Sequence, residues 1–454
     1  MSTDRRSFIR NMSLATLGLS LAPSIIYGKE SPNEKLKLGF IGCGLRGMNH
    51  IENALRRDDV EITALCDIDE KMLKHTFDIF DELEASYPKK IYKKGPYDYR
   101  NLLEDKDVEA VIISTPWLWH TPMSVDAMKA GKYCGVEVSA ATTLPECWDL
   151  VDTHDETATH LMILENVNYR RDVLAVMNMV KAGLFGELLH FRGGYQHDLR
   201  EVKFNDGKQW YGGGVEFGEK GISEAQWRTQ HSLKRNADLY PTHGLGPLAE
   251  YASINKGNRF VSLTSHATKS RGLHDHIVKQ GGEDHPNAEL NWKLGDIVTT
   301  TIETAMGETM IITHDTNVVR PYSLGFRVQG VNGLTEFDYY NSRVHIDGVT
   351  EPHHWDEAQE WFDKYDHPLW KKYEAQAEGS GHGGMDFFLL NAFVESAKQN
   401  IAPPLDVYDA AAWSAVTPLS ELSIENNGAP QHFPDFTKGK WINRKPFDWM
   451  NGNY

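Results

Sequence analysis

Cysteine is scarce in this chain, which has four cysteines among 454 residues. Three of them, Cys43, Cys66 and Cys134, fall in or beside segments with the pattern of buried strands, and Cys147 follows the last of these. A framework of disulfides is therefore not indicated, and we expect all four cysteines to be reduced. The sequence also contains no internal repeat and no low-complexity tract.

Basic residues are also in deficit, with 47 Lys and Arg against 64 Asp and Glu, a formal net charge of −17. This balance argues against nucleic acids and anionic membrane surfaces as partners. Hydrophobic residues at 40% and charged residues at 24% are ordinary for a soluble globular protein, and the length favours two domains. Aromatic residues reach 11%; most must be core, but such rings also hold the flat faces of sugars.

A long hydrophobic run is missing as well. The apolar stretch at 12–28 is too short and too rich in Ser and Gly to indicate a membrane span. It follows Arg5, Arg6 and Phe8 in "DRRSFIR", which predicts a twin-arginine signal peptide over residues 1–30 and export to the periplasm or the cell exterior. No cysteine follows the run for a lipid anchor. The alternative is a short amphipathic terminal helix.

From Leu36 the chain alternates short apolar strands with segments of helical length. Alternation of this kind predicts a doubly wound parallel sheet, an α/β Rossmann domain spanning residues 36–168. The expected strands are "LKLGFIG", "VEITALCD", "VEAVIIST", "KYCGVEV" and "HLMILEN".

A glycine motif at the end of the first strand predicts dinucleotide binding. Gly42, Gly44 and Gly47 have the G-x-G-x-x-G spacing, and Asp67 ends the second strand 25 residues after the first glycine. Such glycines let the backbone approach a pyrophosphate at a helix N-terminus, and the acidic residue can accept hydrogen bonds from the ribose hydroxyls. Asp67 favours NAD over NADP, because a carboxylate repels a 2′-phosphate. Arg46 keeps the NADP alternative open.

Several chemistry-bearing residues follow the ends of the later strands. The carboxyl edge of a parallel sheet is where its ligands bind, so this position indicates a cofactor role for Glu137, with a solvent-exposed strand end as the alternative. Asn166 offers an amide to the cofactor. Tyr169 precedes two arginines that favour phenolate, so it is either a base or a residue packed beneath a helix start.

After about residue 170 the pattern predicts a second, α+β domain over 169–454, with a mostly antiparallel open sheet that serves substrate binding or oligomerisation. Helices are expected at 172–186, 385–400 and 403–428. The Gly- and His-rich stretch 272–295 is expected to be a long loop, either a substrate lid or an oligomer contact. The "YPTH" motif sets Tyr240 and His243 at a helix start, where the histidine is either structural or catalytic. We assign no metal to "HDH" at 274–276.

These motifs together resemble a known family. "GCGLRG", "EVSAATTLPECWDLV", "ILENVNYRRDV", "WRTQH", "LYPTHGLGPL", "RPYSLGFRVQG" and "GHGGMDFF" are similar to glycoside hydrolase family 109, the NAD-dependent α-N-acetylgalactosaminidases. The resemblance runs from about residue 37 to the C-terminus and places the chain in the superfamily of glucose-fructose oxidoreductase, inositol dehydrogenase and MocA. Dehydrogenases of that superfamily carry Glu-Lys-Pro where this chain has Glu137, Val138 and Ser139, so their acid/base lysine is missing.

The resemblance implies hydrolysis of a terminal α-N-acetylgalactosamine through oxidation at C3, elimination across C2 and C1, addition of water and re-reduction. It implies that His243 takes the C3 hydroxyl proton, and Tyr169 is our candidate for the base at C2. The implied substrate residues are Tyr195, Arg228, Tyr240, Pro241, Thr242, His243 and Tyr322. The implied cofactor residues, beyond the three glycines, are Leu45, Arg46, Asp67, Trp117, Leu118, Trp119, His120, Glu137, Val138 and Asn166.

Two other functions stay open at this point. One is an NAD-dependent sugar dehydrogenase that lacks the lysine, and the other is a non-catalytic exported sugar-binding protein. In each case the expected partner is a small sugar or a glycan, with a homo-oligomer as a further possibility.

Overall fold

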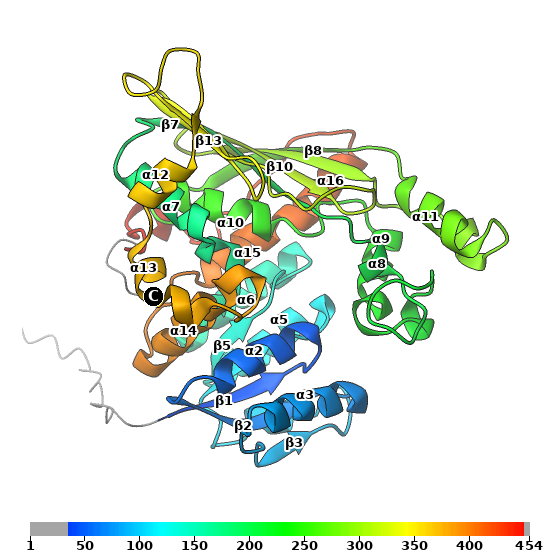
Figure 1. Cartoon of the computed structure of the whole chain (residues 1–454). Coiled ribbons are helices and arrows are strands. Elements are labelled where there is room, and N and C mark those ends of the chain that lie inside the picture. The colour runs from blue at the N-terminus through cyan, green and yellow to red at the C-terminus, as the bar shows by residue number, and fades with distance from the viewer. Residues whose placement is uncertain (1–34, 449–454) are drawn as a thin grey trace, which may run out of the picture. The chain divides into compact units, whose positions relative to one another are not determined.

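The computed structural model describes residues 35–448, so the expected signal peptide at 1–30 lies outside the described residues. The first sheet has six strands that are all parallel. These are β1 (Leu36–Ile41), β2 (Val60–Cys66), β3 (Lys90–Tyr92), β4 (Ala110–Ile113), β5 (Tyr133–Val136) and β6 (Leu161–Ile163). In the order β3-β2-β1-β4-β5-β6, the chain first adds strands on one side of β1 and then, from β4 on, adds them on the other side (Figure 1). A doubly wound sheet binds its ligand between the two strands where this change occurs, here β1 and β4.

Helices connect these strands as crossovers, which parallel pairing requires. Every residue of β4, β5 and β6 is buried, as expected of strands covered on both faces. Thr143 and Glu146 form a reciprocal capping box at the start of the last helix of the set. The helices are α2 (Leu45–Leu55), α3 (Glu70–Glu82), α4 (Tyr99–Leu103), α5 (Trp117–Lys129) and α6 (Leu144–Thr157).

The second sheet has nine strands in the order β14-β13-β12-β11-β7-β10-β9-β8-β15. Its neighbouring strands are antiparallel except for the pair β7 and β10. The fold class predicted from the sequence, a Rossmann sheet followed by an α+β region with a mostly antiparallel sheet, is confirmed. The strands are β7 (Leu188–Gln196), β8 (Phe260–Ala267), β9 (Ile297–Thr304), β10 (Thr309–Asp315), β11 (Phe326–Gly330), β12 (Gly333–Phe337), β13 (Arg343–Ile346), β14 (Asp356–Glu357) and β15 (Gln431–His432).

Side chains alternate across this sheet. In β9 the residues Val298, Thr300 and Ile302 are buried, whereas their neighbours in sequence are partly or fully exposed. The buried face is covered by α10 (Thr242–Tyr251) and α16 (Val416–Glu425), which pack against β7 and β8 (Figure 1). The helix that carries His243 is thereby held on the inner face of the nine-stranded sheet.

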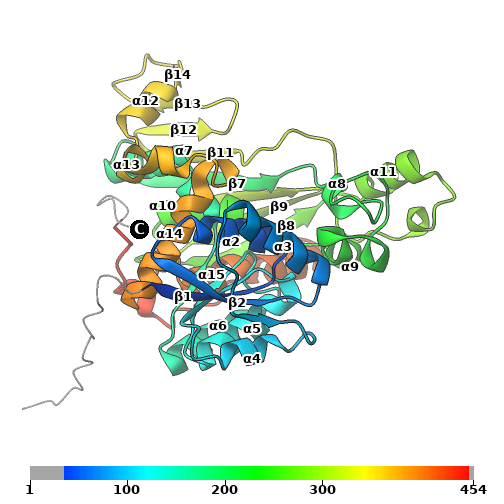
Figure 2. The same ribbon diagram turned by 60° about the horizontal axis from the view of Figure 1, so that its bottom comes forward.

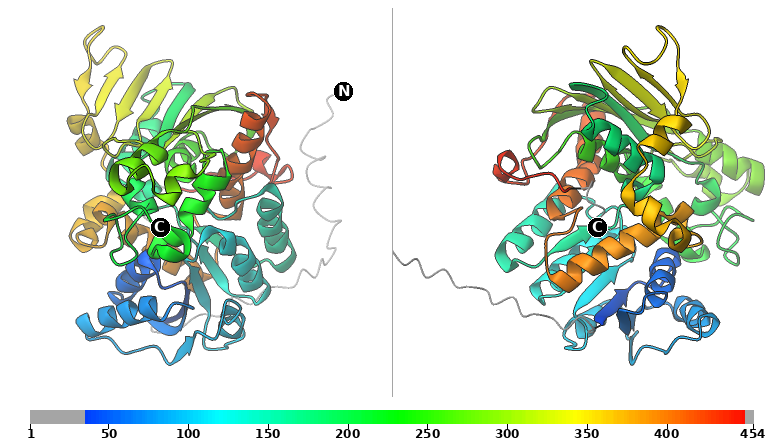
Figure 3. Two further views of the ribbon diagram at one scale, coloured as in Figure 1. Left: turned by 90° about the vertical axis from the view of Figure 1, so that its right-hand side faces the viewer. Right: turned by 60° about the vertical axis from the view of Figure 1, so that its left-hand side comes forward.

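One C-terminal helix returns to the Rossmann region. Helix α14 (Met385–Gln399) packs beside α2 and is the orange helix next to the blue one in Figures 2 and 3. Arg57, just after α2, pairs with Glu395 of α14 at 2.8 Å. Residues from the end of the chain therefore reach the glycine motif near its beginning.

The remaining helices are short. The α-helices are α7 (Arg171–Lys181), α8 (Arg200–Lys203), α9 (Arg228–Lys234), α11 (Gly272–Gly281), α12 (Gln359–Lys364), α13 (Pro368–Ala377) and α15 (Val407–Ser414). The 3₁₀ segments are η1 (Asn166–Tyr169), η2 (Gly218–Lys220), η3 (Ser223–Gln226), η4 (Pro286–Glu289), η5 (His382–Gly384) and η6 (Lys440–Ile442). Within residues 35–448, no helix combines the length and apolarity that crossing a bilayer requires.

Two predictions of local structure are wrong. The stretch 272–295 is not a loop, because it contains α11, whose buried Leu273, His276 and Ile277 have helical spacing. The segment 403–428 forms two helices, α15 and α16, instead of one. The break precedes Pro418, which has no backbone N–H to donate to the carbonyl four residues back. All four cysteines are buried and free, as expected.

Candidate active site

The glycine motif joins β1 to α2, and of its three glycines only Gly44 has room for a side chain. A Cβ atom on Gly42 would lie 2.7 Å from the backbone of Ser114, and one on Gly47 would lie 2.1 Å from the carbonyl oxygen of Gly42. A Cβ atom on Gly44 would meet no atom within 4 Å. Gly42 and Gly47 are therefore needed for packing, whereas Gly44 borders open space in which a pyrophosphate fits.

Asp67 follows β2 and faces this loop. Its Oδ2 atom accepts a hydrogen bond from the backbone N–H of Cys43 at 2.6 Å, and Oδ1 accepts one from the N–H of Asp69 at 2.8 Å. Burial raises the pKa of Asp67, and these backbone hydrogen bonds work in the opposite direction. The carboxylate is thus fixed at the strand end where a ribose would lie.

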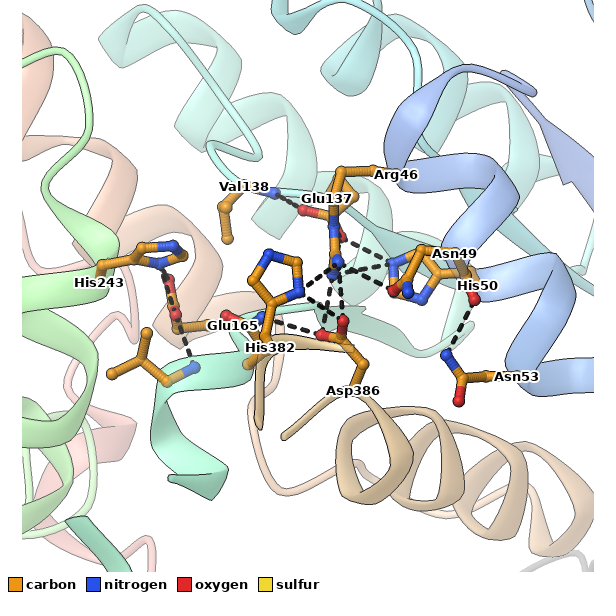
Figure 4. A network of polar contacts seen from close by, with 12 residues as sticks. Arg46, Asn49, His50, Asn53, Glu137, Val138, Glu165, His243, His382 and Asp386 are labelled. Carbon is orange, nitrogen blue, oxygen red and sulfur yellow. Dashed lines mark hydrogen bonds and ion pairs between the residues drawn. The ribbon is translucent and has the colours of Figure 1, made fainter. Parts of the chain in front are cut away.

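Glu137 follows β5 and is 6% exposed, so it is not the solvent-exposed strand end considered from the sequence. Its Oε1 atom accepts hydrogen bonds from Arg46 Nε at 2.9 Å and from His50 Nε2 at 2.7 Å, and the backbone N–H of Val138 donates to Oε2 at 3.1 Å (Figure 4). Burial acts to raise the pKa of Glu137, but Arg46 and His50 outweigh it and lower the pKa to about 2. Glu137 is consequently ionised at any ordinary pH.

Arg46 links Glu137 to the C-terminal part of the chain. Its Nη1 and Nη2 atoms donate to the carboxylate of Asp386 at 3.0 and 3.2 Å, and His382 and Asn166 contact the same carboxylate at 2.6 and 2.8 Å (Figure 4). Arg46 and Asn166, both predicted cofactor residues, thus meet on a residue of α14 that the sequence did not single out. An arginine with two carboxylate partners is not free to bind a 2′-phosphate, which weighs against the NADP alternative.

These residues border a cleft with a volume of about 550 Å³. Ten predicted cofactor residues line it: Gly42, Gly44, Leu45, Arg46, Asp67, Trp117, Trp119, His120, Glu137 and Val138. The other three predicted cofactor residues do not line the cleft. Gly47 packs inside the loop, Leu118 is 61% exposed on α5, and Asn166 donates a hydrogen bond to Asp386. Arg228 and Tyr240, which were predicted to bind substrate, line the same cleft, together with Glu224 and Trp227, which were not predicted.

His243 is the second residue of α10 and forms a pair with a carboxylate. Its Nδ1 atom lies 2.8 and 2.9 Å from Oε1 and Oε2 of Glu165, at the end of β6 (Figure 4). Glu165 is completely buried, and the backbone N–H of Val167 also donates to it at 3.0 Å. With Nδ1 donating to this carboxylate, the neutral ring has its free lone pair on Nε2. Glu165 was not among the residues predicted from the sequence.

Two predicted substrate tyrosines contact His243, and a third packs against one of them. The ring centroids of Tyr195 and Tyr240 lie 5.2 and 4.8 Å from that of His243, and Tyr322 lies 6.2 Å from Tyr195. The Tyr195 hydroxyl is 3.1 Å from Nδ1 of His197. Pro241 and Thr242 form the start of α10, and both side chains are buried. The cluster presents aromatic faces and hydroxyl groups, which together suit a sugar.

Arg228 supplies a positive charge between this cluster and the cleft. Its guanidinium lies 5.2 Å from the ring centroid of Trp117 and 5.0 Å from that of Tyr240, and it pairs with Glu224 at 3.3 Å. Burial acts to lower the pKa of Arg228, but Glu224 and Tyr195 reverse that effect and raise it. The site therefore holds a permanent cation beside its tyrosines.

Tyr169 is placed differently from the other predicted catalytic residue. Its side chain is fully buried in the main hydrophobic core, and it does not line the cleft. Its carbonyl oxygen accepts a hydrogen bond from Trp370 Nε1 at 2.8 Å. This burial is what the packing alternative requires, and the role of Tyr169 as a base stays a prediction. Among residues 35–448, no group of three or more His, Cys, Asp or Glu side chains is arranged to hold a metal ion.

Comparison with solved structures identifies the same fold in sugar dehydrogenases. Levoglucosan dehydrogenase in complex with NADH and L-sorbose aligns with a TM-score of 0.65 over 89% of this chain and all of that chain, at 17% identity. The myo-inositol 2-dehydrogenase of Lactobacillus plantarum aligns with a TM-score of 0.60 at 12% identity, over 88% of this chain and all of its own.

Comparison with protein families and curated sequences is more specific. Residues 36–164 match the oxidoreductase family with an NAD-binding Rossmann fold, and residues 169–443 match the C-terminal domain of glycosyl hydrolase 109. A glycosyl hydrolase family 109 protein of Parabacteroides distasonis is 49% identical, and an α-N-acetylgalactosaminidase of Tannerella forsythia is 48% identical; each alignment covers 98% of this chain and 99% of the relative. The α-N-acetylgalactosaminidase of Shewanella oneidensis is 40% identical over 97% of this chain and 98% of its own length. This chain belongs to glycoside hydrolase family 109.

Proposed function

We propose that this chain hydrolyses terminal α-N-acetylgalactosaminides and uses NAD as a cofactor that is restored in every cycle. The names of two relatives support the substrate class. The observation that carries the proposal is the pair of His243 and Glu165, which contacts the cleft through Tyr240, a residue of the cleft lining whose ring centroid lies 4.8 Å from that of His243. It offers one proton acceptor at the edge of a redox site.

The engaged carboxylates of the cleft do not suit ordinary glycosidase chemistry, which needs one carboxylic acid that donates a proton and a second carboxylate. Glu224 forms an ion pair with Arg228. Glu137 has a pKa of about 2 and three hydrogen-bond donors, so it is not a proton donor. Asp67 already accepts two backbone N–H groups. Redox-assisted hydrolysis requires no such pair.

NAD fits the residues that line the cleft. The open space at Gly44 suits a pyrophosphate against the start of α2, and Asp67 suits ribose hydroxyls while repelling a 2′-phosphate. Bound there, NAD would supply the oxidation of the sugar C3 alcohol to a ketone and the reduction of that ketone after the leaving group has gone.

The residues of the chain would hold the sugar and move its protons. Tyr240, Tyr322 and Arg228 would bind the terminal sugar. His243 would take the proton of the C3 hydroxyl on Nε2 and return it at the end of the cycle. The Glu165 carboxylate would stabilise the imidazolium form between those two steps.

A second proton must leave C2, and we assign this transfer to Tyr195 instead of Tyr169. The pKa of Tyr195 is raised, because burial outweighs the opposing effect of the Arg228 guanidinium. That guanidinium is the group that would stabilise the phenolate before the proton is taken up from C2. Both tyrosines are buried, and the reason for choosing Tyr195 is that its ring contacts that of His243. Tyr195 would remove the C2 proton, which the neighbouring ketone acidifies, as the C1 substituent leaves and takes up a proton from solvent. Water then adds its oxygen at C1, and C2 regains a proton before the ketone is reduced.

The test is a panel of nitrophenyl N-acetylhexosaminides with purified protein, followed by release of nitrophenol and by NADH absorbance. We expect release from the α-galacto compound without accumulation of NADH. A sugar dehydrogenase would accumulate NADH from free sugar and NAD⁺, and a sugar-binding protein would turn over none of the compounds.

We also propose that the chain is exported by the twin-arginine route, on the basis of Arg5, Arg6 and the apolar run that follows. Replacing Arg5 and Arg6 by Lys should leave the protein in the cytoplasm. Unchanged export of that double variant would contradict the route and would leave the enzymatic proposal intact.

A further inference from the structure

A second cavity, of about 490 Å³, lies outside the active-site cleft. Its walls are residues 268–271, which follow β8, and residues 290–293, with His274 of α11 completing them. Helix α11 lies at one end of the nine-stranded sheet, near α8 and α9 (Figures 1 and 2). Part of this cavity thus belongs to the stretch 272–295 that the sequence predicted to be a loop.

The walls of the cavity are positively charged. Lys269, Arg271 and Lys293 line it, and no acidic side chain does. Among residues 35–448, none of these three cations forms an ion pair. The nearest carboxylate in sequence, Asp296, instead accepts hydrogen bonds from the backbone N–H groups of Arg271 and Gly272 at 2.8 to 3.0 Å. In a chain with a net charge of −17, three unpaired cations around one cavity indicate an anionic ligand.

Trp292 gives a second and independent indication. Its side chain is 5% exposed, borders the cavity and packs against Phe204 and Phe217 at centroid distances of 5.6 Å. Its Nε1–H group has no hydrogen-bond partner among the described residues. A buried indole N–H normally has an acceptor, and an oxygen of a ligand in the cavity would provide one.

The cavity is joined to the active-site cleft by one short helix. The backbone N–H groups of Lys293 and Leu294 donate to the carbonyl oxygens of Leu233 and Ser232, near the end of α9. Helix α9 begins at Arg228, which lines the cleft. Seven residues of helix rise roughly 10 Å, so the two sites are separated by a distance of that order along α9.

We propose that this cavity binds an anionic substituent of a glycan, either a sulfate ester or a sugar carboxylate. The anionic part follows from the three cations and the Trp292 N–H group. That this anion is carried by a glycan rests on the proposed function, since the substrates of a glycosidase are glycans and their charged groups are sulfate esters and carboxylates.

The test is calorimetric titration of the full chain with three oligosaccharides of equal length. Chondroitin sulfate carries sulfate and carboxylate, unsulfated chondroitin has the same sugars and carries carboxylate only, and an N-acetylglucosamine oligomer is neutral. We expect the charged oligosaccharides to bind and their affinity to fall with added salt. Binding of chondroitin sulfate alone identifies the sulfate ester, and equal binding of unsulfated chondroitin identifies the carboxylate. Equal binding of the neutral oligomer overturns the proposal.

A pair of matched variants locates the site. Replacing Lys269 and Lys293 by Ala should weaken binding by about tenfold or more, because each lysine is expected to contact the anion directly. Replacing Lys129 and Lys181, two exposed lysines on α5 and α7, by Ala changes the net charge equally and should leave the affinity unchanged. Equal loss in both double variants, or no loss in the first, would contradict a specific site.

Trp292→Phe is the second probe, since it keeps the packed ring and removes only the N–H group. It should weaken binding a few-fold at an unchanged melting temperature, and unchanged affinity would show that the indole does not contact the ligand as proposed. Turnover of neutral nitrophenyl α-N-acetylgalactosaminide by the unaltered chain tests the proposed function separately. A chain without that activity that still binds the charged oligosaccharides contradicts the glycosidase proposal and supports the anion site.

Discussion

His243 Nδ1 lies 2.8 and 2.9 Å from the two carboxylate oxygens of Glu165, which is completely buried. This contact leaves Nε2 as the proton acceptor of the ring and stabilises its charged form. We therefore expect His243→Ala to lower turnover of the α-glycoside by on the order of 10²- to 10⁴-fold while bound NAD is retained. Loss of NAD together with activity would instead indicate a structural role for His243.

The partner of this histidine should act through it. Glu165→Gln keeps the size of the side chain but removes its charge, so we expect a loss of turnover on the order of 10²-fold or more. The variant carrying both changes should be no slower than His243→Ala alone, because two residues that act as one unit are not additive. Steady-state kinetics of all three variants measure this, and losses that multiply would show that the residues act independently.

Gly44 should be required for the cofactor and not for the fold. Its φ is −74°, which any residue adopts, and its Cβ position is open. Gly44→Val should therefore fold with the melting temperature of the NAD-free unaltered chain but should not bind NAD, because the side chain would occupy the space that the pyrophosphate needs. Gly44→Ala should show a weaker effect of the same kind. Mass spectrometry of the small molecules released on denaturation measures the content, and full occupancy in the valine variant would refute this placement of NAD.

Asp238, in the loop that precedes Tyr240 and His243, should make the fold less stable at alkaline pH. Burial raises its pKa to about 7, and the hydrogen bond that it accepts from the backbone N–H of Tyr240 lowers the pKa only in part. Because the pKa is higher in the folded state, the stabilisation is complete below the unfolded pKa of about 3.9 and is lost as the pH rises through 7.

The comparison between Asp238→Asn and the unaltered chain tests whether Asp238 makes the free energy of unfolding fall with rising pH. From pH 5.5 to 8, the free energy of unfolding of the unaltered chain should fall by roughly 2 kcal/mol more than that of the variant. Denaturant titrations at the two pH values measure the difference. Parallel pH dependence in the two proteins would show that Asp238 has an ordinary pKa.

The two candidate tyrosines make opposite predictions. Tyr195→Phe should lower turnover by on the order of 10²-fold or more, since it removes the hydroxyl that we propose as the base at C2. The same hydroxyl contacts His197. Tyr169→Phe should act mainly on the melting temperature, because that side chain is in the core. Kinetics that respond more to Tyr169→Phe would restore Tyr169 as the base.

Much of the cofactor site was predictable because its signals are local. The three glycines, Asp67 and the residues after β4 and β5 follow from strand ends and fixed spacings, which hydrophobic patterns reveal. The partners of these residues were not predictable. Arg46 bonds to Glu137 at a separation of 91 residues and to Asp386 at 340, and only the packing of α14 beside α2 brings the last of these contacts about.

The pair of His243 and Glu165 shows the same limit. His243 was suggested by its place at a helix start together with the family resemblance, but Glu165 lies 78 residues earlier and was not singled out. The stretch 272–295 was misjudged for a different reason. Its glycines and polar residues have loop-like composition, whereas three apolar or ring-bearing side chains at helical spacing were enough to bury one face of α11.

The central claim is that the glycosidic bond breaks by elimination across C2 and C1, and hydrolysis in D₂O tests it most directly. The N-acetylgalactosamine released at low conversion should carry deuterium at C2, as read by NMR or mass spectrometry. Free N-acetylgalactosamine incubated with the protein in D₂O is the control, and it should gain label more slowly than product forms. Released sugar with ordinary hydrogen at C2 would contradict the elimination and would indicate direct displacement at C1.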